Sequence, residues 1–165
     1  MEMFPNDWEV ALHTGVSRLH EAMIRRRKSK GNPTIMAIAC LKRYQALRIQ
    51  EANVQENMMH GGKTRLSKWD LEQETWFNLG RAFHFLSIKF LAINCYVKAL
   101  AGSDAMTVED VISMSEEEGA ESASSAPFDL RKQAAHNLVL LLNVSPEEVV
   151  RAQAQQLIRL FLTLK

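Results

Sequence analysis

Small and aromatic residues at fixed spacings between positions 76 and 100 constrain this fold most. The residues are Trp76, Leu79, Gly80, Phe83, Ala92, Tyr96 and Ala99. The first four recur three and four positions apart, which places them on one face of a helix. A glycine inside a helix costs about 1 kcal/mol relative to alanine, so Gly80 indicates a close approach of a second helix. Ala92 would allow the same approach from the other side, with Phe83 and Tyr96 filling the remaining space. We therefore predict a tightly packed antiparallel helix hairpin.

The same seven positions match, in register, the signature of the tetratricopeptide repeat, which this hairpin resembles. Any helical hairpin shows apolar residues three and four apart, but it does not require a glycine in mid-helix. Ala99 would leave room for the first helix of the next repeat. The proline that often follows such a repeat is replaced by Asp104. The repeat interpretation therefore accounts for more of the pattern than a generic hairpin does.

Helical periodicity covers most of the remaining chain, and strand patterns are nearly absent. Helix starts are predicted at Asn6 or Asp7, Pro33, Ser67, Thr107 and Ser145. The predicted fold is all-α, a tetratricopeptide-like superhelix of about three antiparallel helix pairs. It forms one helical-repeat domain over residues 1–165. We divide it into a first pair (6–58), the best-matching repeat (67–102), an acidic, partly disordered insertion (103–127) and a terminal pair (128–164).

Composition and motifs argue for binding rather than catalysis. The net charge of +1 gives no general electrostatic case for nucleic acid. No apolar run approaches the roughly 20 residues of a membrane span, and Cys40 and Cys95 have the setting of reduced intracellular cysteines. Gly61-Gly62-Lys63-Thr64 lacks the earlier glycine of a phosphate-binding loop. The five histidines show no metal-binding or acid–base spacing. We expect no enzyme activity, no metal and no cofactor.

Two charged segments leave alternatives open. The run Arg25 to Lys30 fits a solvated helix end, a nuclear-import patch or a phosphate contact. From Gly102 to Phe128 there are seven acidic residues and no Lys or Arg. Ser113 and Ser115 each precede a glutamate by three residues, which suits phosphorylation by an acid-directed kinase. The segment could equally be a solvated tether, or it could fold over the basic N-terminal half and mask it.

A partner surface is predicted on the first helix of the best-matching repeat. A repeat of this type lines its concave face with that helix, and the outward positions are Phe77, Arg81, His84 and Phe85. Aromatic residues and arginine dominate interface energies, so these four are candidates for a peptide groove. The alternative for Phe77 and Phe85 is packing against the preceding repeat.

Three longer segments carry a more specific resemblance. They are Met36-Ala-Ile-Ala-Cys-Leu-Lys-Arg-Tyr44-Gln-Ala-Leu-Arg48, Gln73-Glu-Thr-Trp-Phe-Asn-Leu-Gly-Arg-Ala-Phe-His84 and Leu91-Ala-Ile-Asn-Cys-Tyr-Val-Lys-Ala-Leu100. They resemble, in the same order, the C-terminal repeats of the tetratricopeptide subunit of transcription factor IIIC. Leu19–Met23 and Ala134–Leu138 extend the likeness, with His136 in place of an aromatic residue. The acidic insertion and the polar stretch 50–65 depart from the family's motif.

The resemblance implies a nuclear scaffold of the RNA polymerase III machinery. Its expected partners are the other subunits of transcription factor IIIC and components of initiation factor IIIB, without direct DNA contact or a membrane. The alternative is a stand-alone tetratricopeptide adaptor that docks a chaperone or another complex. Chaperone-docking repeats place Lys and Asn on the groove to hold a carboxylate, whereas Phe77 and Arg81 stand at the comparable positions here.

Overall fold

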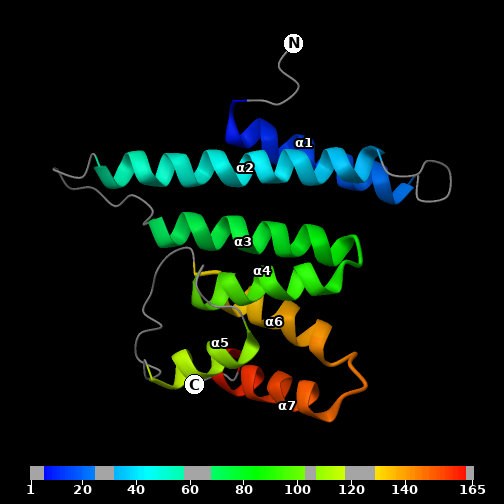
Figure 1. Cartoon of the computed structure of the whole chain (residues 1–165), viewed down its shortest axis with the longest axis vertical. Coiled ribbons are helices and arrows are strands. Elements are labelled where there is room, and N and C mark those ends of the chain that lie inside the picture. Colours follow the sequence, from blue (N-terminus) through cyan, green and yellow to red (C-terminus); the bar gives the residue numbers. More distant parts are fainter. Residues whose placement is uncertain (1–5, 25–31, 58–67, 103–106, 118–128, 163–165) are drawn as a thin grey trace.

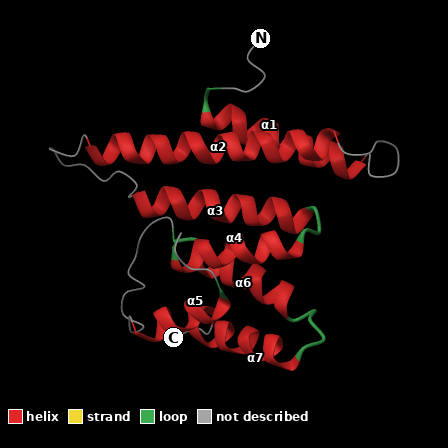
Figure 2. Cartoon of the chain, viewed as in Figure 1, coloured by secondary structure: helices red, strands yellow, loops and turns green. Residues whose placement is uncertain are grey.

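The chain folds into a stack of helices. The computed structural model describes residues 6–24, 32–57, 68–102, 107–117 and 129–162. Within these ranges there are helices, turns and short connections but no strand (Figure 2). The helices are α1 (Trp8–Ile24), α2 (Asn32–Asn57), α3 (Lys68–Phe85), α4 (Lys89–Ala101), α5 (Val108–Glu117), α6 (Arg131–Leu142) and α7 (Glu148–Leu157), which a π-helical turn (Ile158–Leu162) continues. The all-α prediction is confirmed.

Six of these helices form three antiparallel pairs, α1 with α2, α3 with α4 and α6 with α7 (Figure 1). The second helix of each pair also packs against the first helix of the next, α2 on α3 and α4 on α6. Each pair therefore buries its apolar face against its neighbours, as repeat architectures do. The predicted superhelix of three pairs is the observed fold.

Two glycines set the helix spacing in the first two pairs. A Cβ added to Gly80 would lie 2.7 Å from ring carbons of Tyr96, so no side chain fits between α3 and α4 there. A Cβ added to Gly15 would lie 2.8 Å from Cγ of Leu41 in α2. Both glycines are buried. The first pair thus repeats the packing that the sequence signature indicated for the second.

Local capping follows the sequence at two helix starts. Asp7 Oδ1 accepts hydrogen bonds from the backbone N–H groups of Glu9 (2.7 Å) and Val10 (3.3 Å), which confirms the predicted cap of α1. At α5, Thr107 Oγ1 accepts from the N–H of Asp110 (3.1 Å), and Asp110 Oδ2 accepts from the N–H of Thr107 (2.8 Å). This reciprocal pair is a capping box.

The predicted cap at Ser145 is wrong by two residues. Helix α7 begins at Glu148 with Glu147 in the N-cap position, so Pro146 lies before the helix. Ser145 lies in the turn before the helix, where its Oγ accepts from the N–H of Glu147 (3.3 Å) and its own N–H donates to the carbonyl of Leu142 (2.9 Å). The Arg151 guanidinium binds the carbonyls of Ser145 (3.0 Å) and Pro146 (2.6 Å), which holds both outside the helix.

Helix α5 lies within the segment predicted as an acidic insertion. It packs against α4 and α7 and buries Val108, Val111 and Ile112. Gln153 of α7 donates to the carboxylate of Glu109. Residues 107–117 therefore contribute to the core, between the second and third pairs.

Several features singled out in the sequence lie outside the described residues. They are the basic run Arg25 to Lys30, the loop Gly61 to Thr64, Ser67 and residues 118–127 of the acidic insertion. Among the helices that are described, none combines the length and the apolar character needed to cross a bilayer.

Candidate functional site

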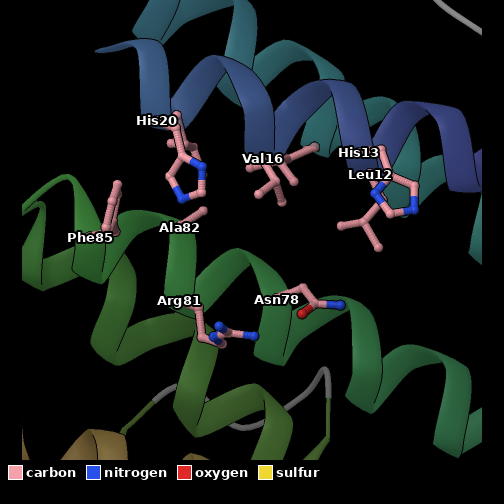
Figure 3. A pocket seen from close by; sticks show the side chains of 10 residues that line it. Leu12, His13, Val16, His20, Asn78, Arg81, Ala82 and Phe85 are labelled. Atoms are coloured by element: carbon pink, nitrogen blue, oxygen red, sulfur yellow. The ribbon is translucent and has the colours of Figure 1, made fainter. Parts of the chain in front are cut away.

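A groove runs between α1 and α3, with α2 beneath it. Its volume is about 400 Å³, and Figure 3 shows side chains of both helices that line it. Its lining is Leu12, His13, Val16, Leu19 and His20 of α1, Leu41 of α2, and Asn78, Arg81, Ala82 and Phe85 of α3. The α1 members recur three or four positions apart, so they form one face of that helix. The groove opens between the first helices of two successive pairs, where repeat proteins present concave binding surfaces.

One end of the groove is polar. Asn78 is the α3 residue nearest His13 of α1, and Arg81 lies farther along α3, toward Phe85 (Figure 3). Asn78 Nδ2 donates to the hydroxyl of Tyr44 (3.0 Å), and that hydroxyl donates to Glu74 (2.8 Å). Arg81 is exposed, and its guanidinium carbon lies 5.8 Å from the ring centroid of Phe77.

The opposite end is aromatic. The His20 ring meets Phe85 edge-on, with ring centroids 5.9 Å apart (Figure 3). This contact joins α1 to α3 across the groove, because the two rings come from different helix pairs. The side chains of Leu12, Val16, Leu19, Leu41 and Ala82 make up the apolar part of the lining.

A partly buried polar network behind the polar end joins the first two pairs. Arg48 of α2 binds Glu74 of α3 (2.5 Å) and Glu51 (2.8 Å), and its guanidinium lies 3.9 Å from the Trp8 ring centroid. Burial alone would lower the pKa of Arg48, but its hydrogen bonds to the two glutamates raise it overall. Burial, followed by the charge of Glu74, raises the pKa of Tyr44 above its ordinary value. Arg48 therefore stays charged and Tyr44 stays neutral.

The four predicted partner-binding residues divide between two sides of α3. Arg81 and Phe85 line the groove. Phe77 is half-buried, with its ring centroid 6.2 Å from that of Tyr96 of the same pair. His84 also faces Tyr96, with its Nδ1 3.4 Å from the tyrosine hydroxyl. Phe77 and His84 do not line the groove, although the Arg81 guanidinium lies beside the Phe77 ring.

The seven signature residues lie in α3 and α4. Six of them are buried, and Trp76 is half-buried with the ammonium groups of Lys98 and Lys42 at 4.8 and 5.9 Å from its ring centroid. The signature therefore serves packing, and none of its members lines the groove.

Sequence reasoning missed every groove residue except Arg81 and Phe85, namely the five from α1, Leu41 of α2, and Asn78 and Ala82 of α3. A signal existed in Gly15, since a second buried glycine with alanine and a large apolar residue in the following helix repeats the pattern of Gly80. The interval from glycine to alanine is 12 residues in the second pair (80 to 92) but 22 in the first (15 to 37). The longer connection hid the equivalence.

None of the remaining chemical candidates lines the groove. Ser113 lies on the exposed side of α5, where its hydroxyl donates to the carbonyl of Glu109 (3.0 Å), and Ser115 lies in the same helix. Cys40 and Cys95 are buried free thiols, and burial raises the pKa of Cys95 to about 11. In the described part of the chain, no three His, Cys, Asp or Glu side chains gather as a metal ion would require.

The chain is similar to the transcription factor tau subunit sfc4 of Schizosaccharomyces pombe, with 28% identity over 130 residues. The similar region covers 79% of this chain but only 11% of that protein. No protein-family model matches the chain. No solved structure matches it either.

Proposed function

We propose that this chain is a protein–protein interaction scaffold in transcription factor IIIC, a complex that acts at RNA polymerase III promoters. The observation that carries the proposal is the similarity to a transcription factor tau subunit across 79% of the chain. In this role the chain assembles subunits of the complex, helps to recruit initiation factor IIIB and acts in the nucleus.

The geometry supports a binding role. The close contacts of Gly15 with Leu41 and of Gly80 with Tyr96 fix the spacing within two pairs, and the Arg48–Glu74 ion pair joins them. A groove held in this way needs little rearrangement to bind, which lowers the entropic cost of association.

We propose binding without catalysis for a chemical reason. The groove lining offers histidine, asparagine and arginine but no carboxylate, thiol or hydroxyl side chain. A serine, threonine or cysteine nucleophile paired with a base, or a pair of carboxylates, would need one of these groups. The lining therefore supports recognition rather than group transfer.

Affinity purification of the tagged protein from cells, with identification of its partners by mass spectrometry, tests this function. Recovery of the other subunits of transcription factor IIIC is the expected result. Recovery of a chaperone or of an unrelated complex instead would show that the chain is an adaptor of another kind.

A matched pair of substitutions on α1 then tests the groove. Val16 lines the groove and is 39% exposed, whereas Val10 is 50% exposed on the same helix and does not line it. We expect Val16→Arg to reduce recovery of at least one subunit and Val10→Arg to leave recovery unchanged. Equal recovery with both variants would place the interaction elsewhere on the chain.

A further inference from the structure

The groove lining contains basic residues but no acidic ones. Arg81, His13 and His20 are its titratable residues, and no acidic side chain contributes to it. Arg81 is exposed and has no ion-pair partner among the residues that the structure describes. Its contact with the Phe77 ring leaves its hydrogen-bond donors available, because a ring face accepts no conventional hydrogen bond. The groove therefore offers a cation beside an apolar surface.

The neighbouring carboxylates are engaged elsewhere. Glu74 lies one helical turn before Asn78, but it is bound by Arg48 at 2.5 Å and by the Tyr44 hydroxyl at 2.8 Å. On α1, Glu21 forms an ion pair with Arg18 at 2.6 Å. These pairings leave the positive charge of Arg81 uncompensated at the groove.

The apolar part of the groove indicates that an anionic ligand would also carry apolar side chains. An enclosed apolar cavity of about 150 Å³ can hold a benzene ring. The volume of about 400 Å³ therefore has room for more than one aliphatic or aromatic side chain. From Leu12 to His20, α1 borders the groove over about 12 Å at 1.5 Å per residue, about two turns of a bound helix.

We infer that the groove binds an acidic amphipathic segment of a partner protein, with its apolar side chains against the exposed Val16 and Phe85 and a carboxylate on Arg81. The inference rests on the proposed function, since it specifies the partner class of the same site. Arginine suits this role because its guanidinium can bind a carboxylate with two parallel hydrogen bonds. The ring contact of His20 with Phe85 bounds one end of the groove, and Arg81 lies between that end and Asn78 (Figure 3).

A random peptide library displayed on phage tests the inference, because it does not require the partner protein to be identified first. The full chain is the bait, in parallel with the variants Arg81→Glu and Lys89→Glu. Lys89 is exposed on α4 and does not line the groove, so its reversal changes the net charge equally. We expect the unaltered chain and Lys89→Glu to enrich peptides that combine Asp or Glu with Leu, Ile or Phe. Arg81→Glu should lose that enrichment.

Fluorescence anisotropy of the most enriched peptide then measures the effect. A charge-assisted contact predicts at least a tenfold weaker affinity for Arg81→Glu, and weaker binding at higher salt for the unaltered chain. Val16→Arg should abolish binding. Circular dichroism confirms that each variant is folded.

Three results would overturn the inference. They are no enriched peptide, peptides without acidic residues, and the same peptides with and without Arg81. Binding of a single-stranded oligonucleotide that depends on Arg81 would also contradict it, because the anion would then be a phosphate backbone.

The two proposals fail separately. If purification recovers no transcription factor subunit but acidic peptides still need Arg81, the groove chemistry stands and the proposed complex does not. If the subunits are recovered and the library shows no acidic preference, the proposed complex stands and the acidic partner does not.

Discussion

Gln73 joins the second pair of helices to the third. It is 1% exposed on α3, and its side-chain amide uses both ends. Its Nε2 donates to the carbonyl of Ala99 near the end of α4 (3.1 Å). Its Oε1 accepts from the N–H of Leu130, the N-cap of α6 (3.0 Å). Replacement by methionine, which has nearly the same size, would remove both hydrogen bonds while keeping the space filled.

The expected loss follows from the two groups left unpaired. A buried donor or acceptor without a partner costs about 1–3 kcal/mol. The Leu130 N–H is only partly buried, and the methionine thioether gains some apolar burial. We therefore expect Gln73→Met to lower the free energy of unfolding by about 2–3 kcal/mol. With a urea m-value of about 2 kcal/mol/M, the midpoint falls by about 1–1.5 M.

Urea denaturation followed by circular dichroism measures this change. The matched control is Gln133→Met, because Gln133 is exposed on α6 and such substitutions usually change stability by less than about 0.5 kcal/mol. Hydrogen exchange adds a local readout, since the Leu130 amide should exchange faster in Gln73→Met. A midpoint for Gln73→Met within the range of the control would refute the role of Gln73.

Three further predictions concern the core. Gly80→Ala should lower the free energy of unfolding by about 1–2 kcal/mol in thermal denaturation, because overpacking against Tyr96 costs about 1–3 kcal/mol and the better helix propensity returns up to about 1. The pKa values of Tyr44 and Tyr96, the two tyrosines of the chain, are raised mainly by burial. Stability should therefore be unaffected by them below about pH 10 and fall above it, by up to about 1.4 kcal/mol per pH unit for each, with tyrosinate absorbance appearing only on unfolding. Cys40 and Cys95 should resist a thiol reagent in the folded chain at neutral pH and react at once in denaturant, because burial raises the pKa of both.

Much of the fold could be predicted because contacts within a helix pair require particular residue types at short, fixed spacings in the sequence. Gly80 and Tyr96 have fixed positions in their helices, so their contact appears as a spacing. The cap at Asp7 and the capping box at Thr107 are likewise local. The start of α7 was missed because Arg151, six residues beyond Ser145, takes the carbonyls that a helix start would have used.

The groove was harder to predict because it forms between helices that are distant in sequence. Counting positions on α3 identified Arg81 and Phe85 but could not show that Phe77 and His84 turn toward Tyr96. The contribution of α1 depends on how closely Gly15 brings it to α2. Sequence periodicity shows which face of a helix is apolar, but it does not show which neighbour that face meets.

Helix α3 contributes to stability through residues in its first half and to the groove through residues in its second half. The adjacent residues Gln73 and Glu74 contact opposite neighbours, Gln73 toward α4 and α6 and Glu74 toward Arg48 of α2. Arg81 and Phe85 follow two to three turns later and line the groove. Gln73 and Arg81 are about 12 Å apart along the helix axis, at 1.5 Å per residue. Among the described residues, the hydrogen bonds of Gln73 go to Ala99 and Leu130, whereas Arg81 lies on the Phe77 ring. Substitutions at these two positions should therefore add independently, with Gln73→Met changing stability and Arg81→Glu changing binding. A stability defect in Arg81→Glu, or a change of peptide specificity in folded Gln73→Met, would show that the Gln73 contacts and the groove are coupled.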